Sequence, residues 1–158
     1  MPTRPNDTFG RDLGGARLLV IDDEESVRRL VRRMLGDCNC RILEAADGFD
    51  GLMLIEREPA MDLVITDLAM PRIGGLAVVQ SLLRRYPELP VVVMSGNSAA
   101  MAAVPEVPVL RKPFAAGELL SIVTDQLSRR SRPAAPSGLP VLPSVRVPPR
   151  PRYRSPPR

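Results

Sequence analysis

Five side chains suited to metal or phosphate chemistry lie at the ends of short, mostly apolar runs of the sequence. They are Asp22, Asp23, Asp67, Ser95 and Lys112. In a parallel sheet the carboxyl ends of such strands meet at one edge, where ligands bind. Three carboxylates at one edge repel one another, and a hard divalent cation with oxygen ligands, above all Mg²⁺, relieves that repulsion. A hydroxyl and an ammonium beside them suit an anionic group, such as a phosphoryl attached to one carboxylate.

The basic and thiol residues narrow the chemistry further. Lys112 is the only lysine among 22 basic residues, and a buried point charge that reaches single oxygens favours lysine over arginine. The chain has no histidine, which excludes Ser/His/Asp and Cys/His nucleophilic sites, histidine-ligated zinc and a phosphohistidine of its own. Cys38 and Cys40 have no further thiol or imidazole to complete a metal site, so we interpret them as ordinary residues at a strand entry.

Apolar runs of strand length alternate with segments of helical period. The first helical segment places Val27, Leu30, Val31, Met34 and Leu35 on one face. The strands that we expect cover residues 18–21, 41–45, 63–66, 91–94 and 107–111, and the longer helices cover 27–35, 48–58, 76–86 and 115–129. Continuous apolar strands that alternate with helices predict a doubly wound α/β fold, a parallel sheet covered on both faces. The segment 96–106 contains Pro105 and leaves room for a fourth helix of two turns at most.

Four sequence blocks carry a resemblance to a known family. They are IDDEE at 21–25, DLAMPRIGG at 67–75, SG at 95–96 and KPF at 112–114. Each block lies at the end of the correct strand, and together they resemble the response regulator receiver domains of two-component signalling. The similarity extends over residues 15–128. It implies a flavodoxin-like fold with strand order 2-1-3-4-5, here with a shortened fourth helix.

The resemblance implies a role for each acidic residue. Asp67 would be the phosphoacceptor, taking a phosphoryl group from the phosphohistidine of a histidine kinase or a histidine phosphotransfer protein. Asp23 and Asp67 would hold Mg²⁺ directly, with the backbone carbonyl of Ala69 as a third protein ligand and Asp22 acting through water.

The resemblance also implies roles for the two remaining site residues. Ser95 would hydrogen-bond one phosphoryl oxygen and Lys112 would pair with another, with a cis peptide between Lys112 and Pro113. Such a protein is not an enzyme that acts on a separate substrate, because it catalyses only its own phosphoryl uptake and autodephosphorylation.

Two departures from the family pattern concern signal output. Many receivers carry Tyr or Phe three residues before the lysine, and this chain has Val109. Because valine is short and the fourth helix is shortened, we expect phosphorylation to act by ordering the loop after Ser95 and by neutralising charge, with weak or no dimerisation. A partner could instead dock on a basic stripe of the first helix, formed by Arg28, Arg29, Arg32 and Arg33.

Charge divides the chain into a body and a tail. Residues 129–158 contain eight arginines and no acidic residue, whereas residues 1–128 carry 14 basic and 18 acidic groups. We predict a disordered extension at 1–14, a receiver domain at 15–128 and a disordered Arg/Pro-rich tail at 129–158. The tail would attract nucleic acid or an acidic protein surface. No apolar run is long enough to span a bilayer, so we expect a cytoplasmic protein with no membrane partner. Because no DNA-binding or catalytic output domain follows residue 128, we expect a stand-alone receiver, with a fragment of a hybrid histidine kinase as the lesser alternative.

Two other functions remain open from the sequence. One is a receiver-like binding module that works without phosphorylation and acts through its basic tail. The other is a Mg²⁺-dependent phosphohydrolase of the haloacid dehalogenase type, which needs an acid/base aspartate two residues after the nucleophile. This chain has Ala69 at that position, which disfavours the hydrolase.

Overall fold

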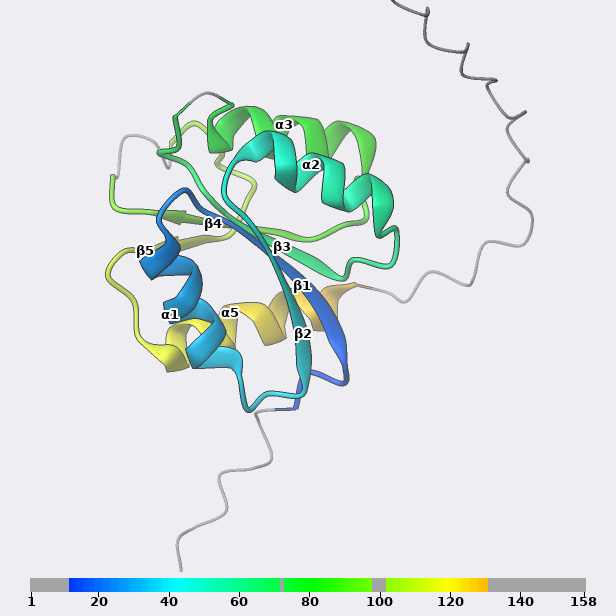
Figure 1. The fold of residues 1–158 in the computed structure, drawn as a ribbon, viewed down its shortest axis with the longest axis vertical. Helices are drawn as coiled ribbons and strands as arrows, with labels where there is room; N and C mark the ends of the chain where they lie inside the picture. Colours follow the sequence, from blue (N-terminus) through cyan, green and yellow to red (C-terminus); the bar gives the residue numbers. More distant parts are fainter. Residues whose placement is uncertain (1–11, 72, 98–101, 131–158) are drawn as a thin grey trace, which may run out of the picture.

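The computed structural model describes residues 12–71, 73–97 and 102–130, which form a twisted parallel sheet between two layers of helices (Figure 1). The strands are β1 (Ala16–Ile21), β2 (Cys40–Ala45), β3 (Leu63–Asp67), β4 (Val91–Ser95) and β5 (Val109–Arg111). They lie in the order β2-β1-β3-β4-β5, and all four neighbouring pairs are parallel. The predicted doubly wound fold and its strand order are confirmed.

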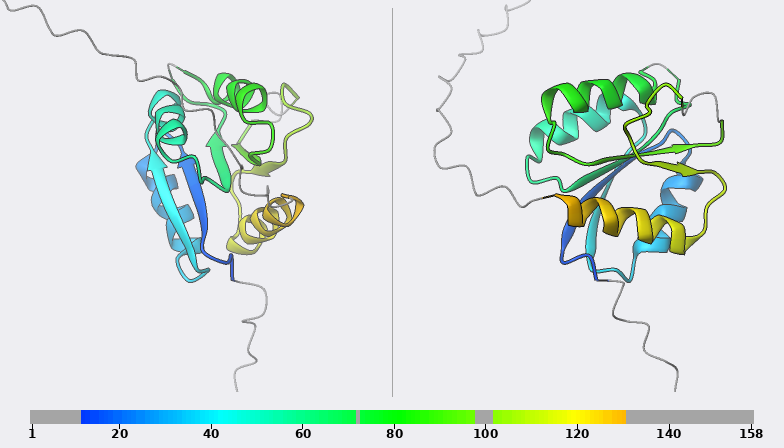
Figure 2. Two further views of the ribbon diagram at one scale, coloured as in Figure 1. Left: turned by 90° about the vertical axis from the view of Figure 1, so that its right-hand side faces the viewer. Right: turned by 180° about the vertical axis from the view of Figure 1, so that it is seen from behind.

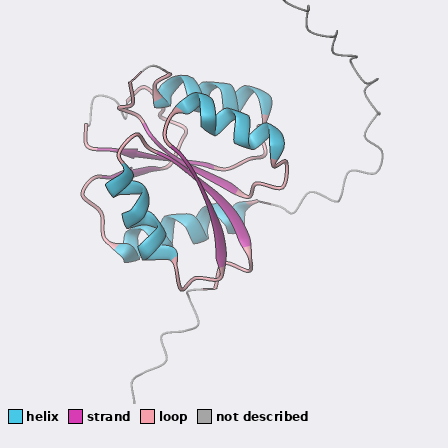
Figure 3. Cartoon of the chain, in the orientation of Figure 1, coloured by secondary structure: helices cyan, strands magenta, loops and turns pink. Residues whose placement is uncertain are grey.

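The helices divide evenly between the two faces of the sheet. Helices α1 (Glu25–Leu35) and α5 (Ala116–Arg129) cover one face, and α2 (Gly48–Arg57) and α3 (Gly75–Arg85) cover the other (Figures 1 and 2). Each helix follows a strand and runs antiparallel to it, back toward the amino ends of the strands, as the connections of a parallel sheet require (Figure 3). The carboxyl ends of all five strands therefore lie on the same side of the domain.

The central strands are buried on both faces, which explains their unbroken apolar sequence. In β1, Leu19 and Ile21 pack with the core beneath α2 and α3, whereas Leu18 and Val20 pack with the core beneath α1 and α5. Successive side chains point to opposite faces of a strand, so both faces of a fully covered strand must be apolar. The two cores hold the strand ends, and the polar residues at those ends, in fixed positions.

Two helices leave an apolar residue at the margin of their buried stripe exposed to solvent. In α1, Val31 and Leu35 are buried, but Leu30 is 40% exposed. In α3, Val79 and Leu82 are buried, whereas Leu83 is 45% exposed. A helix that lies flat on a sheet buries only the side chains directed at the strands, so apolar residues at the margin of the stripe stay in contact with solvent.

The packed unit is slightly longer than the predicted domain. Leu13 is buried and its N–H donates to the carbonyl of Cys38 at 2.7 Å. At the other end the Arg130 guanidinium donates to the Met61 carbonyl at 2.9 Å and to Asp62 at 2.7 Å. The unit thus reaches at least from 13 to 130, two residues beyond 15–128 at each end.

Three predicted features fall wholly or partly outside the described residues. Residues 1–11 and 131–158, predicted to be disordered, are not among them, and neither are residues 98–101 of the predicted fourth helix. The described residues between β4 and β5 form turns. No helix of the described part is long and apolar enough to cross a membrane.

Candidate functional site

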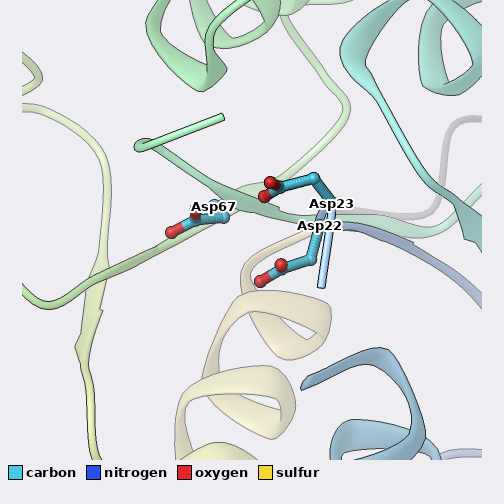
Figure 4. A group of neighbouring side chains, drawn as sticks. All are labelled: Asp22, Asp23 and Asp67. Carbon is cyan, nitrogen blue, oxygen red and sulfur yellow. The ribbon is translucent and has the colours of Figure 1, made fainter. Parts of the chain in front are cut away.

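Three aspartates meet where β1 and β3 end. Asp67 is the last residue of β3, and Asp22 and Asp23 follow β1 directly. Since β1 and β3 are adjacent, with Ile21 opposite Thr66, the strand register itself brings the acidic residues together. One carboxylate oxygen from each of the three lies within 4.8 Å of the others (Figure 4).

The three carboxylates differ in their exposure to solvent. Asp22 is 0% exposed and Asp67 is 5% exposed, whereas Asp23 is open to solvent. The Glu24 N–H donates to Asp22 Oδ1 at 2.9 Å. Burial nevertheless raises the pKa of Asp22 above its usual value, because desolvation outweighs this hydrogen bond and the nearby ammonium. Negative charge at this edge is therefore under-compensated.

Lys112 follows β5 and reaches across to two of the aspartates. Its Nζ donates to Asp22 Oδ2 at 3.0 Å and lies 3.2 Å from Asp67 Oδ1. Burial by itself would lower the pKa of Lys112, but the hydrogen bonds and charges of Asp22 and Asp67 outweigh it and raise that pKa. Lys112 is thus charged and holds the two carboxylates. The Lys112–Pro113 peptide is cis, as the resemblance implied.

Ser95 ends β4 beside Asp67 and is 2% exposed. Its hydroxyl donates to the carbonyl of Asn97 at 3.1 Å and accepts from the Asn97 N–H at 3.1 Å. The carbonyl of Ser95 accepts from the Lys112 N–H at 2.9 Å, which ties the serine to the lysine. A Cβ built on Gly96 would meet no atom within 4 Å, so the approach beside the serine is open.

The loop after β3 carries the proposed carbonyl ligand and a close backbone contact. Ala69 is exposed, two residues beyond Asp67. Gly75 begins α3, and a Cβ built there would overlap the carbonyl oxygen of Asp67. Only glycine lets the helix approach the Asp67 backbone so closely. The helix was predicted to begin one residue later, at 76, and this contact was not predicted.

The first helix does not present the free basic stripe that its sequence predicted. Arg28 and Arg32 both bind Glu44 of β2, through Nε at 3.3 Å and Nη1 at 2.8 Å. Arg29 binds Glu25 at 2.6 Å. Three of the four arginines are thus paired within the fold, and docking of a partner on this helix stays a prediction. Glu44 was missed, although an acidic residue directly after the apolar pair Ile42 and Leu43 of a predicted strand was a usable signal.

The donor set fits a hard divalent cation. Three carboxylates face a single ammonium, and one of the three is accessible to solvent. Mg²⁺ prefers a few carboxylate or carbonyl oxygens and keeps several waters, which an open acidic site of this kind allows. Asp22, Asp23 and Asp67 are the described carboxylates that could hold it.

Comparison with known proteins agrees with the geometry. The profile of the response regulator receiver domain matches residues 18–124. The chain therefore belongs to the response regulator receiver domain family, whose members take part in two-component systems. A receiver domain protein from Clostridium thermocellum is 27% identical, with a TM-score of 0.66 over 72% of this chain and 95% of the other. Chemotaxis protein CheY4 from Vibrio cholerae is 26% identical, with a TM-score of 0.63 over 70% and 97%.

The curated relatives are longer proteins. Response regulator MprA from Mycobacterium sp. (strain KMS) is 34% identical over 76% of this chain and 54% of its own length. The KDP operon transcriptional regulatory protein KdpE from Escherichia coli (strain K12) is 34% identical over 77% of this chain and 56% of its own length. The chain spans about half the length of these relatives, so the likeness concerns their receiver part.

Proposed function

We propose that this chain accepts a phosphoryl group on Asp67 from the phosphohistidine of a histidine kinase or a histidine phosphotransfer protein, with Mg²⁺ bound beside it. The observation that most directly supports this proposal is that the carboxylates of Asp22 and Asp67 differ in how many of their oxygens have a partner. Both oxygens of Asp22 are engaged, by the Glu24 N–H and by Lys112. Among the described residues the Asp67 carboxylate binds only Lys112, through Oδ1, which leaves Oδ2 able to attack.

The transfer step balances without another reactant. An Asp67 carboxylate oxygen attacks the phosphorus, a P–O bond forms, and the P–N bond to the donor imidazole breaks. The electron pair of that bond stays on the imidazole nitrogen. Lys112, placed within 3.2 Å of Asp67, holds positive charge where the incoming phosphoryl adds negative charge.

The same residues supply the ligands for the cation. Asp23, Asp67 and the Ala69 carbonyl would hold Mg²⁺ directly and Asp22 through water. When bound, Mg²⁺ offsets the charge that the phosphoryl oxygens add to an acidic site. The grouping of Asp22, Asp23 and Asp67, with one carboxylate oxygen of each within 4.8 Å of the others, supports this assignment.

Ser95 would contribute by exchanging partners. Its hydroxyl now donates to the Asn97 carbonyl, so donation to a phosphoryl oxygen requires that it release Asn97. This exchange would pull on the loop after β4. Val109 is half-buried against the core beneath α2 and α3 and has no ring to reorient, so we propose that this loop and the change in charge carry the output.

The proposal describes self-modification and not turnover of a separate substrate. The chain would catalyse only its own phosphoryl uptake and loss. The hydrolase alternative needs a carboxylate two residues beyond the nucleophile, and the exposed Ala69 occupies that position.

The test is intact-mass spectrometry after incubation with acetyl phosphate. Wild type should gain one phosphoryl group with Mg²⁺ and none with excess EDTA, and Asp67→Asn should gain none. Asp62→Asn is the matched control, because Asp62 precedes the same strand at its opposite end. Equal phosphorylation of the wild type and Asp67→Asn would refute the proposal.

A further inference from the structure

Arg28 connects the cluster of three aspartates to β2, the strand at one edge of the sheet. It lies in α1 with a side chain that is 13% exposed. Its Nη1 donates to the backbone carbonyl of Asp22 at 2.7 Å, and its Nε donates to Glu44 Oε2 at 3.3 Å. One guanidinium thus bridges β2 and the loop after β1 that carries Asp22 and Asp23.

Glu44 is a firm anchor for this bridge. It lies in β2 opposite Val20 of β1, so its backbone is fixed by the parallel ladder. Its second oxygen, Oε1, binds Arg32 Nη1 at 2.8 Å, which restrains rotation of the carboxylate. The planar fork of arginine suits such a pairing, and a lysine could not make both contacts of Arg28 in the same geometry.

The bridge holds the peptide that joins the two acidic residues. The N–H of Asp22 donates to the Ala45 carbonyl at 3.2 Å, and the Asp22 carbonyl accepts from Arg28. That carbonyl belongs to the peptide between Asp22 and Asp23, so Arg28 sets the direction in which the chain enters Asp23. The Asp23 side chain is exposed, so its place near Asp67 follows from its backbone and not from packing.

We infer that Arg28, anchored by Glu44, is a positioning residue that holds Asp23 ready to bind the cation. The inference rests on the proposed function and extends it to residues that touch neither phosphoryl nor metal. It also explains why Arg28 faces inward. Arg29, the next residue, is exposed and pairs with Glu25 of the same helix.

The test compares Mg²⁺ affinity in full-length variants, read from the amide resonance of Leu68 in two-dimensional NMR. Arg28→Met and Glu44→Gln should each bind Mg²⁺ about 10-fold more weakly than wild type, the usual effect of losing a residue that orients a ligand. Arg28→Lys should retain charge and lose affinity, because it cannot bridge both partners. Arg29→Met, the matched control, should bind like wild type.

Two further readouts separate positioning from general destabilisation. The double variant Arg28→Met/Glu44→Gln should be no weaker than Arg28→Met, since both residues act through one bridge. At saturating Mg²⁺ the rate of phosphoryl uptake from acetyl phosphate should recover to near the wild-type rate, because affinity and not chemistry is impaired. Thermal unfolding in EDTA monitors folding of each variant.

The possible failures are distinguishable. If Arg28→Met, Arg28→Lys and Glu44→Gln all bind Mg²⁺ within twofold of wild type, the inference is overturned and the proposed function stands. If Arg28→Met does not fold, Arg28→Lys and Glu44→Gln decide the question. If the wild type binds no Mg²⁺, the proposed function fails and the inference fails with it.

Discussion

The two ends of the β1–β3 strand pair use the same kinds of charged residue in opposite ways. At the amino end, Asp62 accepts from the Arg17 N–H at 2.8 Å and from Arg130 at 2.7 Å, and Glu58 binds Arg17 at 3.2 Å. Each carboxylate there has an arginine partner. At the carboxyl end, Asp22 and Asp67 share Lys112, and Asp23 lies in the same cluster.

The two ends differ in whether their carboxylates are balanced by arginine partners. Paired charges at the amino end tie the ends of α2 and α5 to the sheet and leave no excess to attract a ligand. The excess at the carboxyl end costs stability, because a buried carboxylate is desolvated without full compensation. Such a cost is typical of functional sites.

The largest change in stability that we expect concerns the close contact between Gly75 and the Asp67 backbone at the carboxyl end. Gly75→Ala should lower the free energy of unfolding by about 3 kcal/mol, because the added methyl would overlap the Asp67 carbonyl and force the backbone apart. Urea denaturation measures it. Gly117→Ala, at a position of α5 with no atom within 4 Å, should instead stabilise by about 0.5 kcal/mol. Equal effects of the two substitutions would show that the contact at Asp67 is not tight.

A cation should stabilise the carboxyl end and leave the amino end unaffected. Binding to the native state alone, Mg²⁺ at ten times its Kd should add about 1.4 kcal/mol to the free energy of unfolding. Asp23→Ala should abolish this gain and Asp62→Asn should retain it, as measured by thermal unfolding in Mg²⁺ and in EDTA. A gain that survives Asp23→Ala would place the cation elsewhere.

Neutralising one aspartate at each end should have opposite effects in EDTA at neutral pH. Asp62→Asn should destabilise by about 1 kcal/mol, because it weakens charge-assisted hydrogen bonds to Arg17 and Arg130. Asp22→Asn should stabilise, since the raised pKa of Asp22 means that folding disfavours its charged form. Chemical denaturation of both variants measures this, and destabilisation by Asp22→Asn would contradict the claim that charge at this end is under-compensated.

The smallest effect concerns the basic tail, which continues from the amino end after Arg130. Deletion of residues 131–158 should leave the melting temperature and phosphoryl uptake unchanged, because the composition of the tail predicts no packed structure. The same deletion should lower the salt concentration at which the protein elutes from a heparin column, since six arginines are removed. A marked fall in melting temperature would show that the tail packs on the body.

The sequence by itself determined the fold class and which polar residues lie at the carboxyl ends of the strands. Continuous apolar strands between amphipathic helices permit few arrangements other than a doubly wound parallel sheet, and such a sheet puts every strand end at one edge. Asp22, Asp23, Asp67, Ser95 and Lys112 could be recognised because each lies at the end of a short, mostly apolar run. Local pattern was sufficient for these features, since they depend on residue order along the chain.

Only the tertiary structure decided how those residues are held. The pairing of Arg28 and Arg32 with Glu44, the contact of Gly75 with Asp67, and the exposure of Leu30 all depend on which elements pack together in space. A helical period identifies one face of α1 but cannot show that its arginines meet a glutamate on a neighbouring strand. Contacts between distant parts of the chain are set by packing geometry, which the order of residues along one element does not contain.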